Sequence, residues 1–196
     1  MPRVLIVYGT TDGHTQKIAE AVADTFASDR WEATAVNAHH ASPDLTPEAY
    51  DRVVIAGSIH GGRYQRALRR WVRTHAAALN RAHTAFLTVC LATLEKRPEV
   101  EQELRDIVEG FFDATGWRPS VSKIVAGAVP YTRYGWLKKF VMKRIVAKAG
   151  GDTDTSRDYD YTDWEDLRQF ALRFARAREQ SPAPVEPGLA LEGAAV

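Results

Sequence analysis

Cysteine is almost absent from this 196-residue sequence, which contains only Cys90. A single cysteine cannot form an intrachain disulfide or a dithiol redox centre, and this scarcity fits a reducing compartment. A charge bias is also lacking, because 26 Lys and Arg residues balance 25 Asp and Glu residues to a formal net charge of +1. The overall charge therefore gives no reason to expect a nucleic-acid partner, and any electrostatic argument has to be local.

Long hydrophobic runs are missing as well. The apolar run Val4–Tyr8 begins only three residues into the sequence and is shorter than the core of a signal peptide. No stretch approaches the roughly 20 apolar residues that a transmembrane helix needs. We therefore expect a cytoplasmic protein, for which peripheral contact with a membrane surface stays open.

Short apolar segments alternate with helical patterns along the chain. Most of these segments are nearly continuous in apolar residues, which is typical of strands buried on both faces of a parallel sheet, whereas Glu32–Val36 alternates and indicates an edge strand. Alternation of strand and helix predicts a doubly wound α/β fold. The predicted strands are Val4–Tyr8, Glu32–Val36, Arg52–Ala56, Thr84–Cys90 and Lys123–Val129.

Four apolar stripes at helical spacing predict the helices that accompany these strands. The last helix is expected to begin at Thr162 or Asp163 as its N-cap. The stripes are Ile18, Ala19, Val22 and Phe26; Leu68, Trp71, Val72, His75 and Leu79; Leu104, Ile107, Val108, Phe111 and Phe112; and Trp164, Leu167, Phe170, Ala171 and Phe174.

Two segments break this rhythm. Residues 130–160 are too long for a simple connection, so we interpret them as an inserted basic helical segment in a single domain that spans residues 1–178. Residues 179–196 are rich in Pro, Ala and Gly without a helical pattern, which predicts a disordered tail.

The loop Gly9–Thr15 joins the first predicted strand to the first predicted helix. Amides at a helix N-terminus favour an anion, threonine hydroxyls add donors, and Gly13 lets the backbone approach a ligand closely. The loop has no Lys or Arg, and the sequence has neither the Gly-x-Gly-x-x-Gly of dinucleotide folds nor the Gly-Lys-Ser/Thr of nucleotide triphosphate loops. A bound monophosphate is the interpretation we favour over plain turn and N-cap residues.

The run Ile6–Thr15 resembles the phosphate loop of flavodoxins. That resemblance implies FMN, a five-stranded parallel sheet in the order 2-1-3-4-5, and ligand binding at the carboxyl ends of the strands. A closer resemblance is to the menaquinone-dependent protoporphyrinogen oxidases. The blocks that carry it are Thr11–Thr15, Tyr50–Ile55, Gly57–His60, Gly127–Tyr134, Gly150–Thr155 and Tyr161–Trp164.

The closer resemblance implies six-electron oxidation of protoporphyrinogen IX to protoporphyrin IX in haem synthesis. Electrons would pass through FMN to menaquinone or another quinone, with the enzyme peripherally associated with the inner face of the cell membrane. Two alternatives stay open: a flavodoxin-type electron carrier, and an FMN-free regulatory module on the same fold. The near-neutral charge and the basic insertion favour the enzyme.

Flavodoxins hold the flavin ring between the loops that follow the third and fourth strands. Here Gly61 and Gly62 are expected to let the chain turn and to offer amides to the ring, and His60 and Tyr64 to stack on it. His60 is also the candidate for proton transfer, because histidine titrates near neutral pH; the alternative is an ordinary surface histidine. We predict no metal site. The predicted cofactor-binding residues are Thr10, Thr11, Asp12, Gly13, His14, Thr15, Ser58, Ile59, His60, Gly61, Gly62, Tyr64, Leu91 and Ala92.

The insertion interleaves basic and aromatic residues and contains no acid between Pro130 and Gly151. This composition suits a membrane interface or the planar, anionic macrocycle of protoporphyrinogen. The charges do not segregate onto one face of a helical wheel, so a solvated helix at the domain edge is the alternative. The predicted substrate or membrane contacts are Tyr131, Arg133, Tyr134, Trp136, Lys138, Lys139, Lys143 and Arg144.

Overall fold

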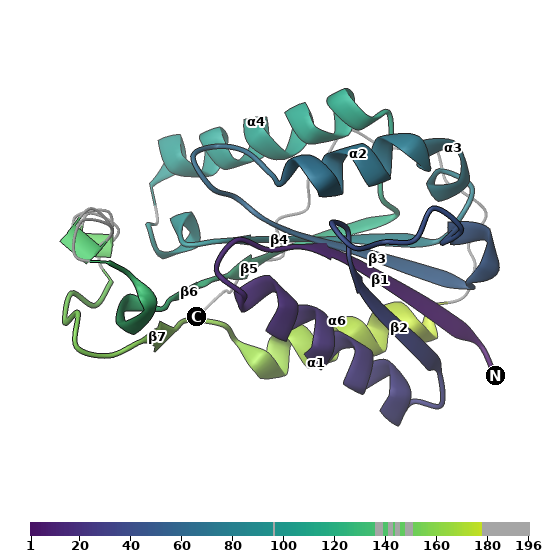
Figure 1. Cartoon of the computed structure of the whole chain (residues 1–196), viewed down its shortest axis with the longest axis horizontal. Helices are drawn as coiled ribbons and strands as arrows, with labels where there is room; N and C mark the ends of the chain where they lie inside the picture. The colour runs from purple at the N-terminus through teal and green to yellow at the C-terminus, as the bar shows by residue number, and fades with distance from the viewer. Residues whose placement is uncertain (96, 136–138, 141–142, 144–145, 148–150, 178–196) are drawn as a thin grey trace.

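The structure, a computed structural model, describes residues 1–95, 97–135, 139–140, 143, 146–147 and 151–177. Its main sheet has five parallel strands in the order β2-β1-β3-β4-β5, which confirms the predicted topology (Figure 1). The strands are β1 (Arg3–Gly9), β2 (Glu32–Asn37), β3 (Arg52–Ser58), β4 (Thr84–Cys90) and β5 (Val121–Ala126).

Helices cover both faces of this sheet (Figure 1). The helices on one face are α1 (His14–Ser28) and α6 (Trp164–Arg176), which pack against each other. The helices on the other face are α2 (Arg66–Thr74), α3 (Ala76–Leu79) and α4 (Pro98–Thr115). Three short 3₁₀ turns lie in the connections, namely η1 (Pro47–Ala49), η2 (Ala92–Leu94) and η3 (Tyr131–Arg133).

These two helical layers explain the continuous apolar runs of the sequence. Along β1, Val4 and Ile6 belong to the core that α1 and α6 cover, whereas Leu5 and Val7 belong to the core under α2 and α4. All four side chains are fully buried. A strand covered on both faces has no position open to water, so its sequence shows no polar alternation. β2 pairs with β1 alone and keeps partly exposed residues, which confirms the predicted edge strand.

The fifth predicted strand ends earlier than its apolar pattern indicates. The sequence predicts a strand over Lys123–Val129, but β5 stops before Gly127, and Ala128–Val129 forms β6 in a separate sheet. The Gly127 carbonyl accepts a hydrogen bond from the Tyr161 N–H at 3.1 Å. The chain therefore leaves the main sheet at Gly127, and β6 pairs antiparallel with β7 (Tyr159–Asp160).

The helix expected over Leu68–Leu79 is divided. α2 ends and α3 begins at His75, whose φ of −103° and ψ of 11° interrupt the helix. Neither Gly nor Pro marks that position, so the apolar stripe alone predicts one helix. At the last helix the N-cap is Asp163, whose side chain accepts from the Asp166 N–H, whereas the Thr162 hydroxyl donates to the sheet.

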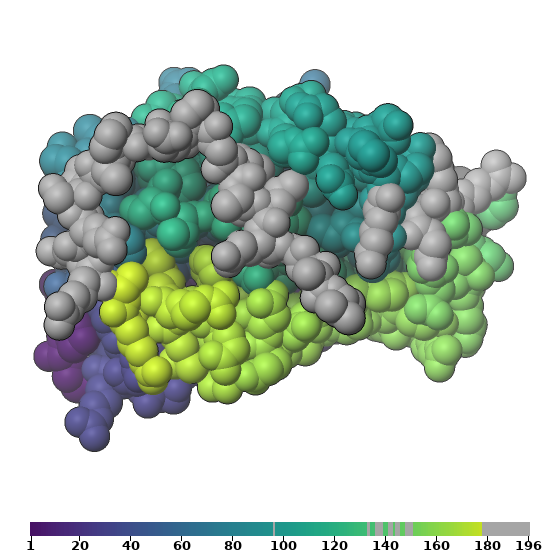
Figure 2. Space-filling model, turned by 180° about the vertical axis from the view of Figure 1, so that it is seen from behind, coloured from purple at the N-terminus to yellow at the C-terminus, as the bar shows by residue number. Residues whose placement is uncertain are grey.

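The ribbon of β6 and β7, together with η3, forms a third packing unit, which we call the insertion cluster. Its buried side chains are Val129, Tyr131, Tyr134 and Val146, and Leu91 of the loop after β4 packs against them. Figure 1 shows this green region beyond the ends of the main strands, and Figure 2 shows the light-green residues before α6 at the same end of the molecule. The insertion cluster therefore lies at the carboxyl edge of the sheet.

Helical backbone occurs in the insertion at residues 139–140, 143 and 146–147, in agreement with the expected helical segment. Among the helices that the structure describes, none is long and apolar enough to cross a membrane. The tail predicted over residues 179–196 lies outside the described residues.

Candidate functional site

The loop between β1 and α1 leaves a helix N-terminus open to a ligand. Gly13 is the N-cap of α1 and has a φ of 88°, a left-handed conformation that glycine adopts without steric cost. The Gly13 N–H donates to the Thr10 hydroxyl at 2.9 Å, which fixes the loop. No side chain caps α1, and its first turn holds no acidic residue. The first N–H groups of α1 are therefore suited to bind an anion.

The Thr15 hydroxyl is the observation that most strongly indicates a ligand here. Thr15 lies in the first turn of α1 and is 1% exposed. Its Oγ1 is buried and has no hydrogen-bond partner within the described part of the chain. Leaving a buried hydroxyl unpaired costs about 1–3 kcal/mol, so such atoms usually have a partner that completes them. A phosphate oxygen at the start of α1 satisfies this requirement.

Asp12 is in the same loop, but its carboxylate makes contacts with other loops. The Tyr134 hydroxyl, which belongs to the insertion cluster, donates to Asp12 Oδ2 at 3.1 Å. His60 Nε2, in the loop after β3, lies 3.9 Å from the same oxygen. Asp12 therefore joins three segments that are far apart in the sequence. These contacts direct its side chain toward Tyr134 and His60, so any contribution to a phosphate comes from its backbone.

His14 ties the start of α1 to the end of the insertion. The Thr162 hydroxyl donates its one proton to the Ala126 carbonyl, so it accepts from His14 Nε2–H at 2.7 Å. Burial lowers the pKa of His14, although the Asp160 carboxylate at 3.6 Å partly opposes this. A neutral His14 with its proton on Nε2 therefore holds the start of α1 against Thr162, in the segment between β7 and α6.

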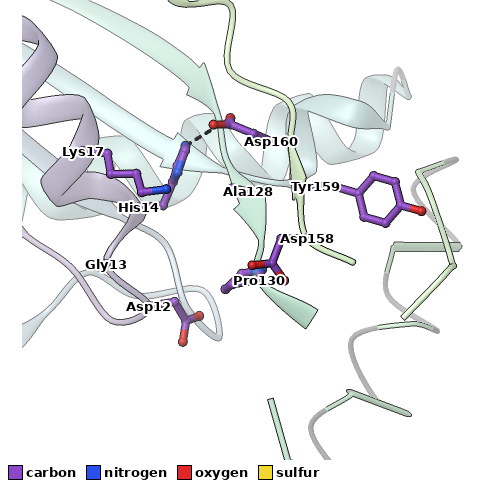
Figure 3. A pocket seen from close by; sticks show the side chains of 9 residues that line it. All are labelled: Asp12, Gly13, His14, Lys17, Ala128, Pro130, Asp158, Tyr159 and Asp160. Carbon is purple, nitrogen blue, oxygen red and sulfur yellow. Dashed lines mark ion pairs between the residues drawn. The ribbon is translucent and has the colours of Figure 1, made fainter. Parts of the chain in front are cut away.

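A small hollow of about 100 Å³ lies between the start of α1 and the ribbon of β6 and β7 (Figure 3). It is too small for a flavin ring, because ligand pockets are typically about 300–1,000 Å³. Its lining shows how closely the phosphate loop and the ribbon approach each other. The lining residues are Asp12, Gly13, His14, Lys17, Ala128, Pro130, Asp158, Tyr159 and Asp160.

The loop after β3 ends in an exposed two-residue turn. His60 and Arg63 exchange backbone hydrogen bonds of 2.9 and 3.2 Å, and Gly61 and Gly62 at the tip have φ values of 55° and 71°. Two consecutive positive φ values characterise the tightest hairpin turns, which favour glycine. The sequence-based expectation of a glycine turn is therefore confirmed, and His60 stands at its base with a side chain 43% exposed.

Gln65 is a residue of this site that sequence reasoning missed. Its Nε2 donates to Ser58 Oγ at 2.8 Å and to Thr11 Oγ1 at 3.1 Å, so it holds the loop after β1 against the end of β3. Gly9 leaves room for this side chain, because a Cβ there would lie 2.7 Å from Gln65 Oε1. A glutamine before a helix carries no motif, and only the fold brings it between the two loops.

The expectation that Tyr64 stacks on the flavin is wrong. Tyr64 is 8% exposed, and its ring packs against Phe86 and Phe111 in the core under α4. Its hydroxyl pairs with Thr88 Oγ1 at 2.8 Å, and burial raises its pKa. Tyr64 therefore supports the loop from below, because both its ring and its hydroxyl have partners inside the protein.

The loop after β4 begins at the lone cysteine. Cys90 is 6% exposed, and burial raises its pKa to about 11, so the thiol is protonated at neutral pH. Leu91 packs on the insertion cluster, and Ala92 begins the turn η2. Gly127 donates its N–H to the Cys90 carbonyl at 3.0 Å, which brings β5 beside this loop. Loops after β1, β3 and β4 thus meet at one edge of the sheet.

Comparison with known proteins agrees with this arrangement. The flavodoxin domain family model matches residues 5–156. A protein from Escherichia coli strain K12, named protoporphyrinogen IX dehydrogenase (quinone), is 35% identical over 179 residues, which cover 91% of this chain and 97% of that protein. This chain belongs to the protoporphyrinogen IX dehydrogenase (quinone) family.

A more distant member of the protoporphyrinogen IX dehydrogenase (quinone) family is known from Leishmania major. It is 29% identical over 89% of this chain and 75% of its own length. Among solved structures, oxidised flavodoxin 1 from Bacillus cereus is similar with a TM-score of 0.54 and 12% identity, covering 88% of this chain and 96% of the flavodoxin. At that identity the likeness shows the fold alone.

Flavodoxin-like folds bind FMN at the switch point between β1 and β3, and the described residues of this family member fit that cofactor. The buried Thr15 hydroxyl needs a partner, the N-terminus of α1 is uncapped, and no acidic residue lies in its first turn. Nothing comparable indicates a metal, since the described residues contain no group of three or more potential metal ligands.

The insertion residues divide into buried and exposed ones. Tyr131 is fully buried and its hydroxyl donates to the Asp152 carbonyl, so it has no surface left for the predicted contact with substrate or membrane. Tyr134 is 8% exposed, which likewise excludes contact with a membrane surface. Lys139 is half-buried and Lys143 is exposed. Trp136, Lys138, Arg144 and the side chain of Arg133 lie outside the described part of the protein.

Proposed function

We propose that this protein oxidises protoporphyrinogen IX to protoporphyrin IX, with FMN as redox cofactor and a quinone as electron acceptor. Family membership supports the reaction. The observation that carries the cofactor assignment is the buried Thr15 hydroxyl, which has no partner among the described residues, beside the open start of α1. Removal of six hydrogen atoms from the porphyrinogen releases six electrons and six protons. Three two-electron steps therefore reduce three quinones to three quinols.

When bound, FMN would accept two electrons from the substrate and pass them to the quinone. The hydroxyls of Thr10, Thr11 and Thr15 and the first amides of α1 bind its phosphate. The glycine turn after β3 and the loop that begins with Leu91 would hold the ring and orient it. The covered sheet beneath keeps water from that side of the site.

His60 is the proposed proton acceptor of the reaction. Each oxidation step releases protons, and the partly exposed imidazole can pass a proton to water. The Asp12 carboxylate lies 3.9 Å from its Nε2 and favours the imidazolium that forms when His60 accepts a proton.

The quinone is proposed to be menaquinone, reached at the inner face of the cell membrane, in the pathway of haem synthesis. Support comes from the exposed part of the insertion. Phe140 is 55% exposed, and the basic side chain of Lys143, three residues later in the sequence, is exposed as well. An apolar ring next to a basic side chain is the combination that binds membrane interfaces.

An anaerobic assay tests this function. FMN-loaded protein receives protoporphyrinogen IX and a menaquinone analogue, and porphyrin fluorescence is followed above the spontaneous rate. We expect porphyrin only when FMN and quinone are both present. FMN-loaded protein that forms no porphyrin above the spontaneous rate would contradict the proposal and favour a flavodoxin-type electron carrier. Omission of quinone is the matched control. Dithionite, added without substrate, should still reduce the FMN of a protein that is only an electron carrier.

A further inference from the structure

We infer that Asp12 is a positioning residue that fastens the insertion to the phosphate loop through Tyr134 and holds His60 beside the flavin. The inference rests on the proposed function for the role of His60, and on geometry alone for the contact with Tyr134. Tyr134 donates to Asp12 Oδ2 at 3.1 Å, and the same oxygen lies 3.9 Å from His60 Nε2.

A carboxylate is an unexpected residue in a loop that binds phosphate. Two like charges repel, and the repulsion weakens binding when they share a partly buried site. The Asp12 side chain is 19% exposed, so water screens it only in part. The Asp12 carboxylate therefore lowers phosphate affinity, which suggests that it has a different role. Its contacts with Tyr134 and His60 indicate this role, because both partners belong to other loops of the site.

The insertion cluster makes a second contact with the site, which fixes its orientation. Leu91 of the loop after β4 packs against the cluster. A Cβ on Gly151 would lie 3.4 Å from Leu94 of η2 and 2.7 Å from Val146 of the cluster, so the chain passes closely between them. The cluster is thus held by apolar contacts on the β4 side and by the Tyr134–Asp12 hydrogen bond on the β1 side.

Burial makes the Tyr134 hydroxyl dependent on Asp12. Tyr134 is 8% exposed, and burial together with the Asp12 carboxylate raises its pKa, so the hydroxyl remains a donor at neutral pH. A hydrogen bond to a charged acceptor is stronger than one between neutral groups. Loss of the Asp12 carboxylate takes this acceptor away from Tyr134. It also removes the charged group that approaches His60.

Three variants separate the two contacts. In Asp12→Ala, we expect turnover of porphyrinogen to fall about tenfold, the scale of one lost charged hydrogen bond, while FMN affinity stays equal or rises about threefold because a like charge is gone. Trypsin should cleave within residues 132–148 faster, since Tyr134 loses its hydrogen bond to Asp12. In Asp12→Asn, the amide oxygen still accepts from Tyr134, so cleavage stays at the wild-type rate while turnover falls. Tyr134→Phe should accelerate cleavage without weakening FMN binding.

Tyr159→Phe is the matched control, because Tyr159 packs on the same cluster but its hydroxyl accepts only from the exposed Arg157 among the hydrogen bonds the structure records. It should leave cleavage and FMN affinity unchanged. Parallel losses of FMN affinity and turnover in Asp12→Ala would overturn the inference, since they indicate a residue that only shapes the phosphate loop. Wild-type cleavage rates in both Asp12→Ala and Tyr134→Phe would overturn the fastening role. If wild-type protein forms no porphyrin, the proposed function fails, while the cleavage and affinity results still decide the Asp12–Tyr134 contact.

Discussion

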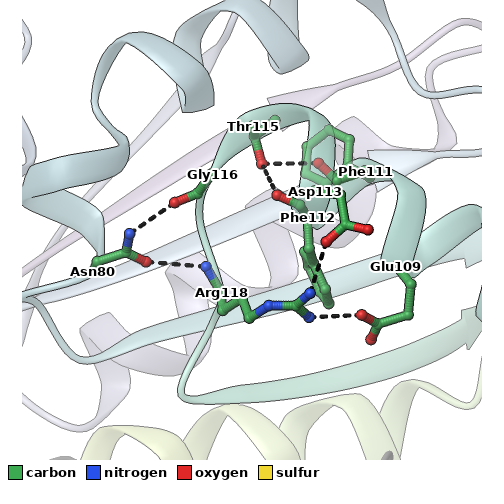
Figure 4. Close-up of polar contacts among 8 residues, drawn as sticks. All are labelled: Asn80, Glu109, Phe111, Phe112, Asp113, Thr115, Gly116 and Arg118. Carbon is green, nitrogen blue, oxygen red and sulfur yellow. Dashed lines mark hydrogen bonds and ion pairs between the residues drawn. The ribbon is translucent and has the colours of Figure 1, made fainter.

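The two edges of the main sheet use polar side chains in opposite ways. At the carboxyl edge, the Thr15 hydroxyl is buried without a partner in the described chain, and α1 begins without a side-chain cap. At the amino edge, where α4 leads into β5, polar groups complete one another (Figure 4). The comparison separates groups that hold the fold together from groups that are left available to a ligand.

The amino-edge corner is built around the end of α4. Gly116 has a φ of 69° and ends the helix, and its carbonyl accepts from Asn80 Nδ2 at 2.8 Å. The side-chain oxygen Oδ1 of Asn80 accepts in turn from the Arg118 backbone N–H at 3.0 Å. The Arg118 guanidinium pairs with Glu109 and Asp113 at 2.6 and 2.8 Å. Such a corner stabilises the fold and leaves little for a ligand to bind.

The largest effect on this comparison is expected from Thr15→Val, which keeps the shape but removes the hydroxyl. FMN affinity should fall about 10- to 100-fold, as expected for loss of a hydrogen bond to a charged phosphate. The unfolding free energy of the apoprotein should not fall, because the hydroxyl has no partner there. FMN titration and urea unfolding measure the two quantities. The control is Thr25→Val, because the Thr25 hydroxyl donates to the Ala21 carbonyl and lies in the same helix; it should leave FMN affinity unchanged. An unaltered FMN affinity in Thr15→Val would remove the phosphate-loop assignment.

Asn80→Ala is expected to have the reverse signature. Loss of its two hydrogen bonds to backbone should lower the unfolding free energy by about 1 kcal/mol. FMN affinity should be unchanged, since the corner is at the opposite edge. Urea unfolding and FMN titration provide the readouts. Gln169→Ala, which removes a partly exposed side chain whose hydrogen bond, among the described residues, goes to Glu165, is the control and should change neither quantity. A drop in FMN affinity in Asn80→Ala would mean that the two edges are coupled.

The smallest effect should be a change in pH dependence on replacing His14 by Gln, which still donates to Thr162. Burial lowers the pKa of folded His14 below the ordinary 6.5. The unfolded chain therefore takes up a proton more readily, and the folded protein loses stability as the pH falls below about 6.5. Urea midpoints measured from about pH 7 to about pH 5 should fall less steeply in His14→Gln. Equal slopes would show that His14 is not held neutral.

The conformation of the loop before α1 was predictable because it depends on neighbours in the sequence. A buried strand, a glycine and hydroxyl residues before a helix determine locally where amides point. The glycine turn at Gly61 and Gly62 was predictable for the same reason. The insertion was not: its aromatic residues suggest surface contact, yet Tyr131 and Tyr134 are buried. Composition alone does not distinguish a ring that meets a membrane from one that packs on its own chain.

The sequence by itself determined the succession of strands and helices along the chain and the double coverage of the sheet, which follow from periodicity and need no distant partner. Its motif blocks carried the resemblance to the family. Only the tertiary structure decided that Gly127 ends β5, that Gln65 links two loops, and that Asp12 faces Tyr134 and His60. Each of these depends on contacts between residues far apart in the chain, whose geometry arises when the sheet and the insertion cluster pack together.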